Sequence, residues 1–179
     1  LQGELRVVDL PVREIERAVV DRRADVGLTY VPHPHADLAF RPIAAMSFGI
    51  YAQASAFRRT PFKDLPFAVP VSLLAAAPSG APAVDGWPEG VYRNVRFRLS
   101  MLQTALELAT RGHCAVFIPD VIAKLSNRRS GREGKLTKRR GPQGLRPVSQ
   151  TAYLVTRVER QDEARWEALA GGLAQLLSG

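Results

Sequence analysis

The chain has 179 residues, of which 46% are hydrophobic and 23% are charged, so it can bury a core, which excludes a globally disordered protein. No apolar run approaches the roughly 20 residues of a membrane-spanning helix, and the first residues do not show the basic and then apolar pattern of a signal peptide. The net charge is +8, and the single cysteine, Cys114, excludes an internal disulfide, which fits a reducing cytoplasm.

The first elements in chain order predict a strand–helix–strand unit. Residues 4–8 (ELRVV) form a β-rich run. The helix that follows has an apolar stripe at helical spacing, made of Val12, Ile15, Ala18 and Val19. Residues 24–31 (ADVGLTYV) form a continuous apolar run, which is typical of a strand buried on both faces. We expect a right-handed parallel crossover between the two strands.

Further strands are predicted at residues 40–44 (FRPIA), 47–52 (SFGIYA) and 67–72 (FAVPVS). The stretch before the third of them, residues 57–67 (FRRTPFKDLPF), is rich in turn residues and predicts a short surface helix or a loop. Residues 75–92 are dense in proline and glycine, so we expect a loop with little regular structure.

The clearest unit follows this loop. Residues 94–100 (NVRFRLS) predict a strand, and the sequence SMLQTALELATRG predicts a helix with both ends marked. Ser100 is a good N-cap, and Gln103, three residues later, completes a capping box. Gly112 occupies the position of a left-handed C-cap. Residues 113–119 (HCAVFIP) then predict a buried strand.

The excess positive charge lies in one segment near the C-terminal end. A short helix is predicted at residues 120–126, and residues 124–146 hold nine basic residues and one acidic residue. The rest of the chain holds 16 of each. The segment has little apolar content, so we expect an exposed, solvated loop. Contact with DNA phosphates or with a partner is the alternative, and the lack of aromatic residues for base stacking disfavours nucleic acid.

The chain closes with a strand at residues 151–158 (TAYLVTRV) and a helix from about Asp162. The apolar face of this helix consists of Trp166, Leu169, Ala170, Leu173 and Leu177. Two strand–helix–strand units separated by a proline- and glycine-rich stretch predict two α/β lobes, with the late strand and last helix returning to the first lobe. Ligands in such folds bind outside the carboxyl ends of strands, beside helix N-termini.

Two groups of residues could carry other chemistry. His33, His35 and Asp37 have the H-x-H-x-D spacing of some metal sites, but a metal needs more ligands than these three provide in extended chain. Cys114 could be a nucleophile, but its neighbour His113 should face the opposite side of the predicted strand. We therefore expect a polar turn and a buried structural cysteine, with no catalytic residue, no metal and no cofactor.

The order of these elements resembles the effector-binding domain of LysR-type transcriptional regulators. Residues 13–43 (REIERAVVDRRADVGLTYVPHPHADLAFRPI) are similar to the family's helix, short "lDlgl" strand, turn and "dl...pl" stretch. The matching residues are Asp25, Gly27, Leu28, Asp37, Leu38, Pro42 and Ile43. Residues 100–125 resemble the family's later "aG.Gia.lP" signature, with matches at Gly112 and Pro119.

The resemblance implies an α/β fold of two Rossmann-like lobes joined by a two-strand hinge, like that of type II periplasmic binding proteins. Lobe I would comprise residues 1–65 plus 155–179, lobe II residues 66–154, and the hinge would be SFGIYA and TAYLVT. The chain departs from the family pattern in two ways. It has no helix-turn-helix domain, and LQGELRV runs straight into VDLPVREIE, without the helix and strand that the family places between them.

What the resemblance implies for function is a cytoplasmic ligand-sensing domain that is not an enzyme. A small effector would bind in the cleft between the lobes, and the helix N-termini near Ser72 and Ser100 suggest that it is anionic. The expected contact residues are Tyr30, Pro32, Met46, Ser72, Ser100, Met101, Ile118 and Pro119. We expect a homo-oligomer that reaches DNA only through the missing helix-turn-helix domain. A periplasmic-type solute-binding protein is the main alternative, and a metal-dependent hydrolase built on HPHAD is a third.

Overall fold

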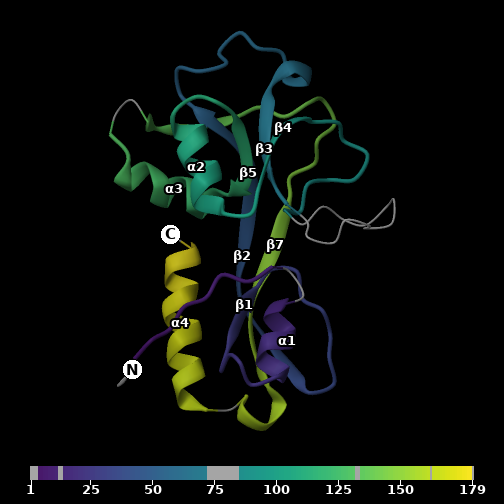
Figure 1. Ribbon diagram of the computed structural model, residues 1–179, viewed down its shortest axis with the longest axis vertical. Coiled ribbons are helices and arrows are strands. Elements are labelled where there is room, and N and C mark those ends of the chain that lie inside the picture. Colours follow the sequence, from purple (N-terminus) through teal and green to yellow (C-terminus); the bar gives the residue numbers. More distant parts are fainter. Residues whose placement is uncertain (1–3, 12–13, 72–84, 132–133, 162, 179) are drawn as a thin grey trace. The chain divides into compact units, whose positions relative to one another are not determined.

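The computed structural model describes residues 4–11, 14–71, 85–131, 134–161 and 163–178 (Figure 1). The chain divides into two compact units. Unit 1 comprises residues 1–46 and 150–179, and unit 2 comprises residues 47–149. The chain passes between the units inside the long strand β2 (Leu38–Gln53) and at the start of β7 (Ser149–Arg157). None of the described helices is long and apolar enough to cross a membrane.

Unit 2 is built on a mixed sheet. Its strands are β3 (Pro66–Pro70), β4 (Asn94–Leu99), β5 (Ala115–Pro119), β6 (Leu136–Arg139) and the second half of β2. Strand β3 runs parallel to both β4 and β5, whereas β5 and β6 run antiparallel to β2. Helices α2 (Leu102–Thr110) and α3 (Asp120–Arg129) lie together beside β5 (Figure 1).

The core of unit 2 forms between this sheet and its helices. Strand β5 lies in the middle of the sheet, so its apolar residues are buried along almost its whole length. Leu106 and Ala109 of α2 pack with Val116 and Ile118 of β5. Trp87 lies in ring contact with three phenylalanines, which are Phe62, Phe67 and Phe117. Removing these apolar surfaces from water is what holds the sheet and helices together.

Unit 1 has a smaller sheet, in which β7 lies between β1 (Gly27–Thr29) and the first half of β2. Helix α1 (Glu14–Val20) packs on one face of it, with Val19, Leu38 and Val155 in a shared cluster. The buried Arg157 guanidinium donates hydrogen bonds to the Val19 and Ala24 carbonyl oxygens at 2.9 and 3.2 Å. These bonds supply a partner for carbonyl groups at and just after the C-terminal end of α1, which have none within the helix.

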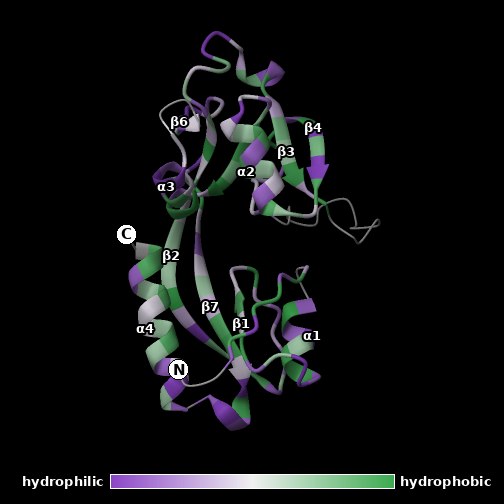
Figure 2. Ribbon diagram, turned by 60° about the vertical axis from the view of Figure 1, so that its left-hand side comes forward, coloured by the Kyte–Doolittle hydropathy of each residue, from purple (hydrophilic) through white to green (hydrophobic). Residues whose placement is uncertain are grey.

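The remaining elements are the long helix α4 (Ala164–Ser178) and two short 3-10 helices, η1 (Phe62–Asp64) and η3 (Val158–Arg160). Figure 2 shows hydrophobic and hydrophilic residues together along α4, as expected for an amphipathic helix. The face predicted from the sequence is confirmed: Trp166 is buried, and Leu169, Ala170, Leu173 and Leu177 are half-buried.

Several predicted elements are confirmed, including strands β4, β5 and β7 and helices α1 to α3. The predicted C-cap is also confirmed. Gly112 has a φ of +78°, the amide of Gly112 donates to the Ala109 carbonyl at 3.1 Å, and that of His113 donates to the Leu108 carbonyl at 2.9 Å. This pattern of two bonds is the Schellman motif, which favours glycine at its left-handed position. The part of the predicted loop at residues 72–84 lies outside the described residues.

The predicted first strand is wrong. Residues 4–8 form no strand and pair with no other described segment, and Leu5, Val7 and Val8 are exposed. The described residues therefore do not form the expected parallel crossover, and the strand found in this region, β1, has three residues that pair antiparallel with β7. Leu28 is 44% exposed whereas its neighbour Thr29 is buried, so only one face of β1 is covered, and the strand is not buried on both faces as expected.

Two further predictions need correction. Residues 40–44 and 47–52 do not form two strands, because both belong to the single strand β2. The basic segment is not an exposed loop throughout. Its first residues extend α3 to Arg129, and residues 136–139 form β6, which pairs with β2 and buries Leu136.

The lobes expected from the family resemblance and the two compact units do not share their boundaries. The expected lobes meet at residues 65/66 and 154/155, whereas the units meet at 46/47 and 149/150. The junctions of the units lie next to the expected hinge strands, SFGIYA and TAYLVT. The lobe boundaries therefore remain a prediction.

Candidate functional site

The carboxyl ends of three strands of unit 2 lie at one edge of its sheet. Because β3 is parallel to β4 and β5, the chain leaves all three strands at the same edge, and the Val71 amide donates to the Leu99 carbonyl there at 2.9 Å. Helix α2 starts just after β4, and α3 starts directly after β5. This carboxyl edge, which we define as residues 70–71, 99–102 and 119–120, is where a ligand of such a sheet is expected.

Ser100 does not cap α2, so the predicted capping box is wrong. The N-cap is Met101, which has extended backbone angles (φ −112°, ψ 124°) and makes no side-chain capping bond. The helix therefore begins one residue later than the box requires, and both Ser100 and Met101 are exposed. The first amides of a helix have no partner within the helix, so α2 presents uncapped N–H donors and a positive dipole end at this edge.

The other predicted residue at this edge is Pro119, which ends β5 and is half-buried. Its neighbour Ile118 is 4% exposed and belongs to the core cluster of unit 2. The structure thus brings Ser100, Met101 and Pro119 to one sheet edge, whereas the Ile118 side chain packs in the core. Ser72 lies outside the described residues.

Three predicted residues belong to unit 1. Tyr30 follows β1 and is half-buried, and Pro32 is exposed in the turn after it. Met46 is buried in β2, at the last position of unit 1 in that strand. Their common role as effector contacts remains a prediction.

The histidines of the HPHAD turn serve local structure. The buried Glu16 of α1 accepts a hydrogen bond from the His33 amide at 3.1 Å, and the His33 Nδ1 atom lies 3.7 Å from the same carboxylate. The Asp37 amide donates to His35 Nδ1 at 3.2 Å. In the part of the chain that the structure describes, no group of three or more His, Cys, Asp or Glu residues could hold a metal ion. The turn is therefore fastened to α1.

Cys114 is fully buried at the start of β5, whereas its neighbour His113 is exposed. Burial raises the pKa of the Cys114 thiol to about 11, although a backbone hydrogen bond involving Ala68 acts in the opposite direction. A nucleophilic cysteine needs a lowered pKa and access to solvent. The structure supports the prediction of a structural cysteine.

A polar cluster that the sequence did not predict joins three elements of unit 2. Asp120, the first residue of α3, accepts a 2.9 Å hydrogen bond from the Tyr51 phenol and lies 2.8 Å from Lys138 Nζ. A Cβ atom at Gly49 would approach the Lys138 Cε atom to 2.6 Å and Asp120 Oδ1 to 3.1 Å, so the cluster needs a glycine at that position. Tyr51 and Asp120 meet because β5 pairs with β2, and Lys138 joins them because β6 also pairs with β2, which the sequence did not indicate.

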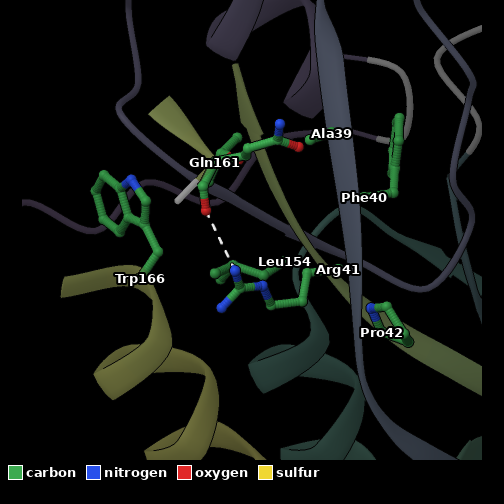
Figure 3. Close-up of a pocket in the computed structure, with 8 residues that line it drawn as sticks. Ala39, Phe40, Arg41, Pro42, Leu154, Gln161 and Trp166 are labelled. Carbon is green, nitrogen blue, oxygen red and sulfur yellow. Dashed lines mark hydrogen bonds between the residues drawn. The ribbon is translucent and has the colours of Figure 1, made fainter. Parts of the chain in front are cut away.

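Unit 1 contains a pocket that the sequence also did not predict (Figure 3). The pocket has a volume of about 260 Å³ and is lined by residues 39–42 of β2, Leu154 and Thr156 of β7, Gln161 and Trp166. None of these residues is among the contact residues expected from the sequence. Because they come from two segments far apart in the chain, residues 39–42 and 154–166, no local motif could have revealed them.

The comparison with models of protein families identifies one family for this chain. The family model described as the LysR substrate binding domain matches residues 2–177, which is nearly the whole chain. Among curated protein sequences, none matches the chain at a significant level.

Solved structures support the same fold at low sequence identity. The regulatory domain of a C206S mutant of OxyR2 from Vibrio vulnificus has a TM-score of 0.64 and 16% identity, covering 94% of this chain and 79% of that one. The regulatory domain of CcmR from Synechocystis PCC6803, in complex with 2-PG, has a TM-score of 0.65 and 11% identity, covering 94% and 81%.

A longer protein is also similar. The probable transcriptional regulator PA0477 from Pseudomonas aeruginosa has a TM-score of 0.59 and 18% identity, and the match covers 91% of this chain. The match spans 52% of PA0477, so the present chain corresponds to about half of that regulator's length. At these identities the likeness establishes the fold, which is that of the type II periplasmic binding proteins.

Proposed function

Since the chain belongs to the LysR substrate-binding domain family, we propose that it is the ligand-sensing part of a LysR-type transcriptional regulator and that its effector is a small anion. The observation that carries this proposal is the family match over residues 2–177. The complex of the related CcmR domain with 2-PG supports a small-molecule ligand. No specific observation favours a periplasmic-type solute-binding protein.

The proposed effector site lies between lobe I (residues 1–65 plus 155–179) and lobe II (residues 66–154). Its proposed contact residues are those expected from the sequence: Tyr30, Pro32, Met46, Ser72, Ser100, Met101, Ile118 and Pro119. The support for an anionic effector is the carboxyl edge of the unit 2 sheet. There the uncapped start of α2 offers backbone N–H donors and a positive dipole end beside the exposed Ser100.

Sensing requires no chemistry on the effector, and we propose that the chain catalyses no reaction. Effector binding would favour one arrangement of the two lobes, by no more free energy than the effector's preference for that arrangement. In the whole regulator, which we propose to be a cytoplasmic homo-oligomer, this change would reach DNA through a helix-turn-helix domain.

Thermal unfolding with a panel of small carboxylates and their neutral amides tests the proposal. A ligand that binds only the native state at a hundredfold excess over its Kd adds about 2.7 kcal/mol of stability. We expect one carboxylate of the panel to raise the unfolding temperature while its amide does not. If no carboxylate raises the unfolding temperature more than its amide, the proposal of an anionic effector is wrong.

A pair of variants at Ser100 tests whether the stabilising carboxylate binds at the start of α2. Ser100→Asp places a negative charge at the start of α2, which the helix dipole tolerates but which repels an anionic ligand. Ser100→Asn has nearly the same shape and no charge. The carboxylate should therefore stabilise Ser100→Asn and fail to stabilise Ser100→Asp, while the two proteins without ligand unfold at similar temperatures. Equal stabilisation of both variants would place the anion away from α2.

A further inference from the structure

The pocket of unit 1 contains a buried donor without a partner. Trp166 is 5% exposed, and its Nε1 atom has no hydrogen-bond partner among the described residues. Figure 3 shows the indole nitrogen on the edge of the ring that faces Gln161. A buried N–H group without an acceptor is unfavourable, so an acceptor that enters the pocket would gain a hydrogen bond that the protein leaves unmade.

A cation lies on the same side of β2 as this donor. Figure 3 shows the Arg41 side chain and Trp166 on one side of the strand, with the Phe40 and Pro42 rings on the other. The Arg41 guanidinium donates one hydrogen bond to the Gln161 carbonyl oxygen at 3.2 Å. Its Nη1 atom lies 3.7 Å from the carboxylate of Glu167, which is mostly exposed. A guanidinium has five N–H donors, so several remain for a ligand.

The rest of the pocket is small and partly apolar. Leu154 and Thr156 of β7 are both buried, and they line the pocket together with Ala39 of β2. Its volume of about 260 Å³ is below the range of roughly 300–1,000 Å³ that is typical for drug-sized ligands. The pocket therefore combines a short apolar wall with a fixed cation and an unused neutral donor.

We propose that this pocket is a second ligand site, which binds a small organic monocarboxylate. One carboxylate oxygen accepts a hydrogen bond from Trp166 Nε1, and the carboxylate pairs with the Arg41 guanidinium in a charge-assisted contact. The apolar part of the ligand lies against Leu154 and Ala39. The site does not depend on the proposed effector site, because none of its residues is among those proposed for the effector.

The two tryptophans of the chain provide a direct test. The Trp87 indole already donates to the Val91 carbonyl oxygen at 2.8 Å, so its NMR signal is an internal control for that of Trp166. The 15N–1H spectrum of the labelled full chain is recorded with isovalerate or benzoate, and with isovaleramide or benzamide as neutral probes of matched shape. The Trp166→Phe variant assigns the two indole signals.

We expect at least one of the two carboxylates to shift the Trp166 indole signal in a saturable way, with no comparable shift of the Trp87 signal and none with the amide. Concentrations up to about 10 mM suffice, because even a ligand with a Kd of about 1 mM would then occupy most sites. No shift with either carboxylate, or equal shifts with acid and amide, would overturn the proposal.

A matched pair of arginine variants tests whether the Arg41 guanidinium binds the carboxylate. Arg41→Gln should weaken carboxylate binding at least tenfold, whereas Arg22→Gln should leave it unchanged. Arg22 is an equally charged residue of unit 1 that pairs with Glu159 at 3.3 Å and lines no part of the pocket. Equal affinity of the Arg41→Gln and Arg22→Gln variants would show that the pocket does not hold the anion. If Arg41→Gln does not fold, the acid and amide comparison on the unaltered chain still decides the question.

Discussion

The Tyr51 phenol on β2 donates a 2.9 Å hydrogen bond to the Asp120 carboxylate at the first residue of α3. Lys138 of β6 contacts the same carboxylate at 2.8 Å, and its ammonium lies 6.0 Å from the centre of the Tyr51 ring. One carboxylate thus joins β2, β6 and α3. Since Asp120 follows β5 directly, this cluster fixes one part of the carboxyl edge at which we propose the effector binds.

Removing the phenol should destabilise the protein modestly. In Tyr51→Phe the ring still fills its place in the core, and Asp120 keeps its pair with Lys138, so the variant loses one hydrogen bond. We expect the free energy of unfolding to fall by about 1 kcal/mol. Urea denaturation measures it, with Tyr92→Phe as the control because that phenol is exposed. Equal stabilities of the two variants would show that the hydrogen bond contributes nothing.

The stabilisation by Tyr51 should depend on pH in one direction. Burial, followed by the hydrogen bond to Asp120 and its negative charge, raises the pKa of the Tyr51 phenol above its ordinary value of 10.0. The folded state therefore favours the protonated phenol, and its contribution is fully present below about pH 10 and declines above it. The stability difference between the natural chain and Tyr51→Phe should be constant from about pH 8 to 10 and then shrink. A difference that grows above pH 10 would contradict this.

The thiol of Cys114 should be unreactive in the folded protein. With a pKa of about 11, roughly one thiol in a thousand is a thiolate at pH 8, and the side chain is fully buried. Because Cys114 is the only cysteine, the reaction of the chain with a thiol-specific disulfide reagent reports on this residue alone. We expect slow labelling of the native chain and complete labelling in denaturant. Rapid labelling of the native chain would mean that β5 opens readily.

Breaking the buried ion pair of unit 2 should be costly. Arg93 donates to both carboxylate oxygens of Asp85, and its guanidinium lies 4.9 Å from the centre of the Trp87 ring. Asp85→Ala leaves this cation, whose side chain is only 12% exposed, without its partner, so we expect a loss of about 3 kcal/mol in urea denaturation. Asp64→Ala removes an exposed carboxylate and should change stability by less than about 0.5 kcal/mol. A similar effect of the two substitutions would contradict the role of the pair.

The sequence could predict those elements whose own residues show, by their pattern, which side chains are buried and where the element ends. Strand β5 is continuously apolar because it lies in the middle of a sheet, and Gly112 follows α2 at the position that needs a left-handed residue. The resemblance to LysR regulators rested on the order of such elements, and the family match over residues 2–177 confirmed it.

Elements that exist only through a partner could not be predicted. The residues of β6, LTKR, have no apolar pattern, and the strand forms because it pairs with β2. Conversely, residues 4–8 have a high strand propensity, but none of the strands that the structure describes pairs with them. Propensity describes what a residue tolerates, whereas a strand also needs a partner for its backbone groups.

The same distinction applies to the site. The S-x-x-Q spacing at Ser100 fits a capping box, yet α2 starts after Met101, and a shift of one residue removes the capping bond. The expected contacts Ser100, Met101 and Pro119 still share one sheet edge, because the first two follow β4 and Pro119 ends β5, and both strands run parallel to β3. The pocket beside Trp166 depends on how β2, β7 and α4 pack, which no local pattern records.

Hydrogen exchange with and without the most stabilising carboxylate tests the central claim most directly. The first amides of α2 have no partner within the helix, so they should exchange quickly in the free chain and slowly when an anion accepts their hydrogen bonds. We predict that ligand-dependent protection includes residues 101–104, and that Ser100→Asp abolishes it while Ser100→Asn does not. A carboxylate that stabilises the chain without protecting these amides would contradict an effector site at the start of α2.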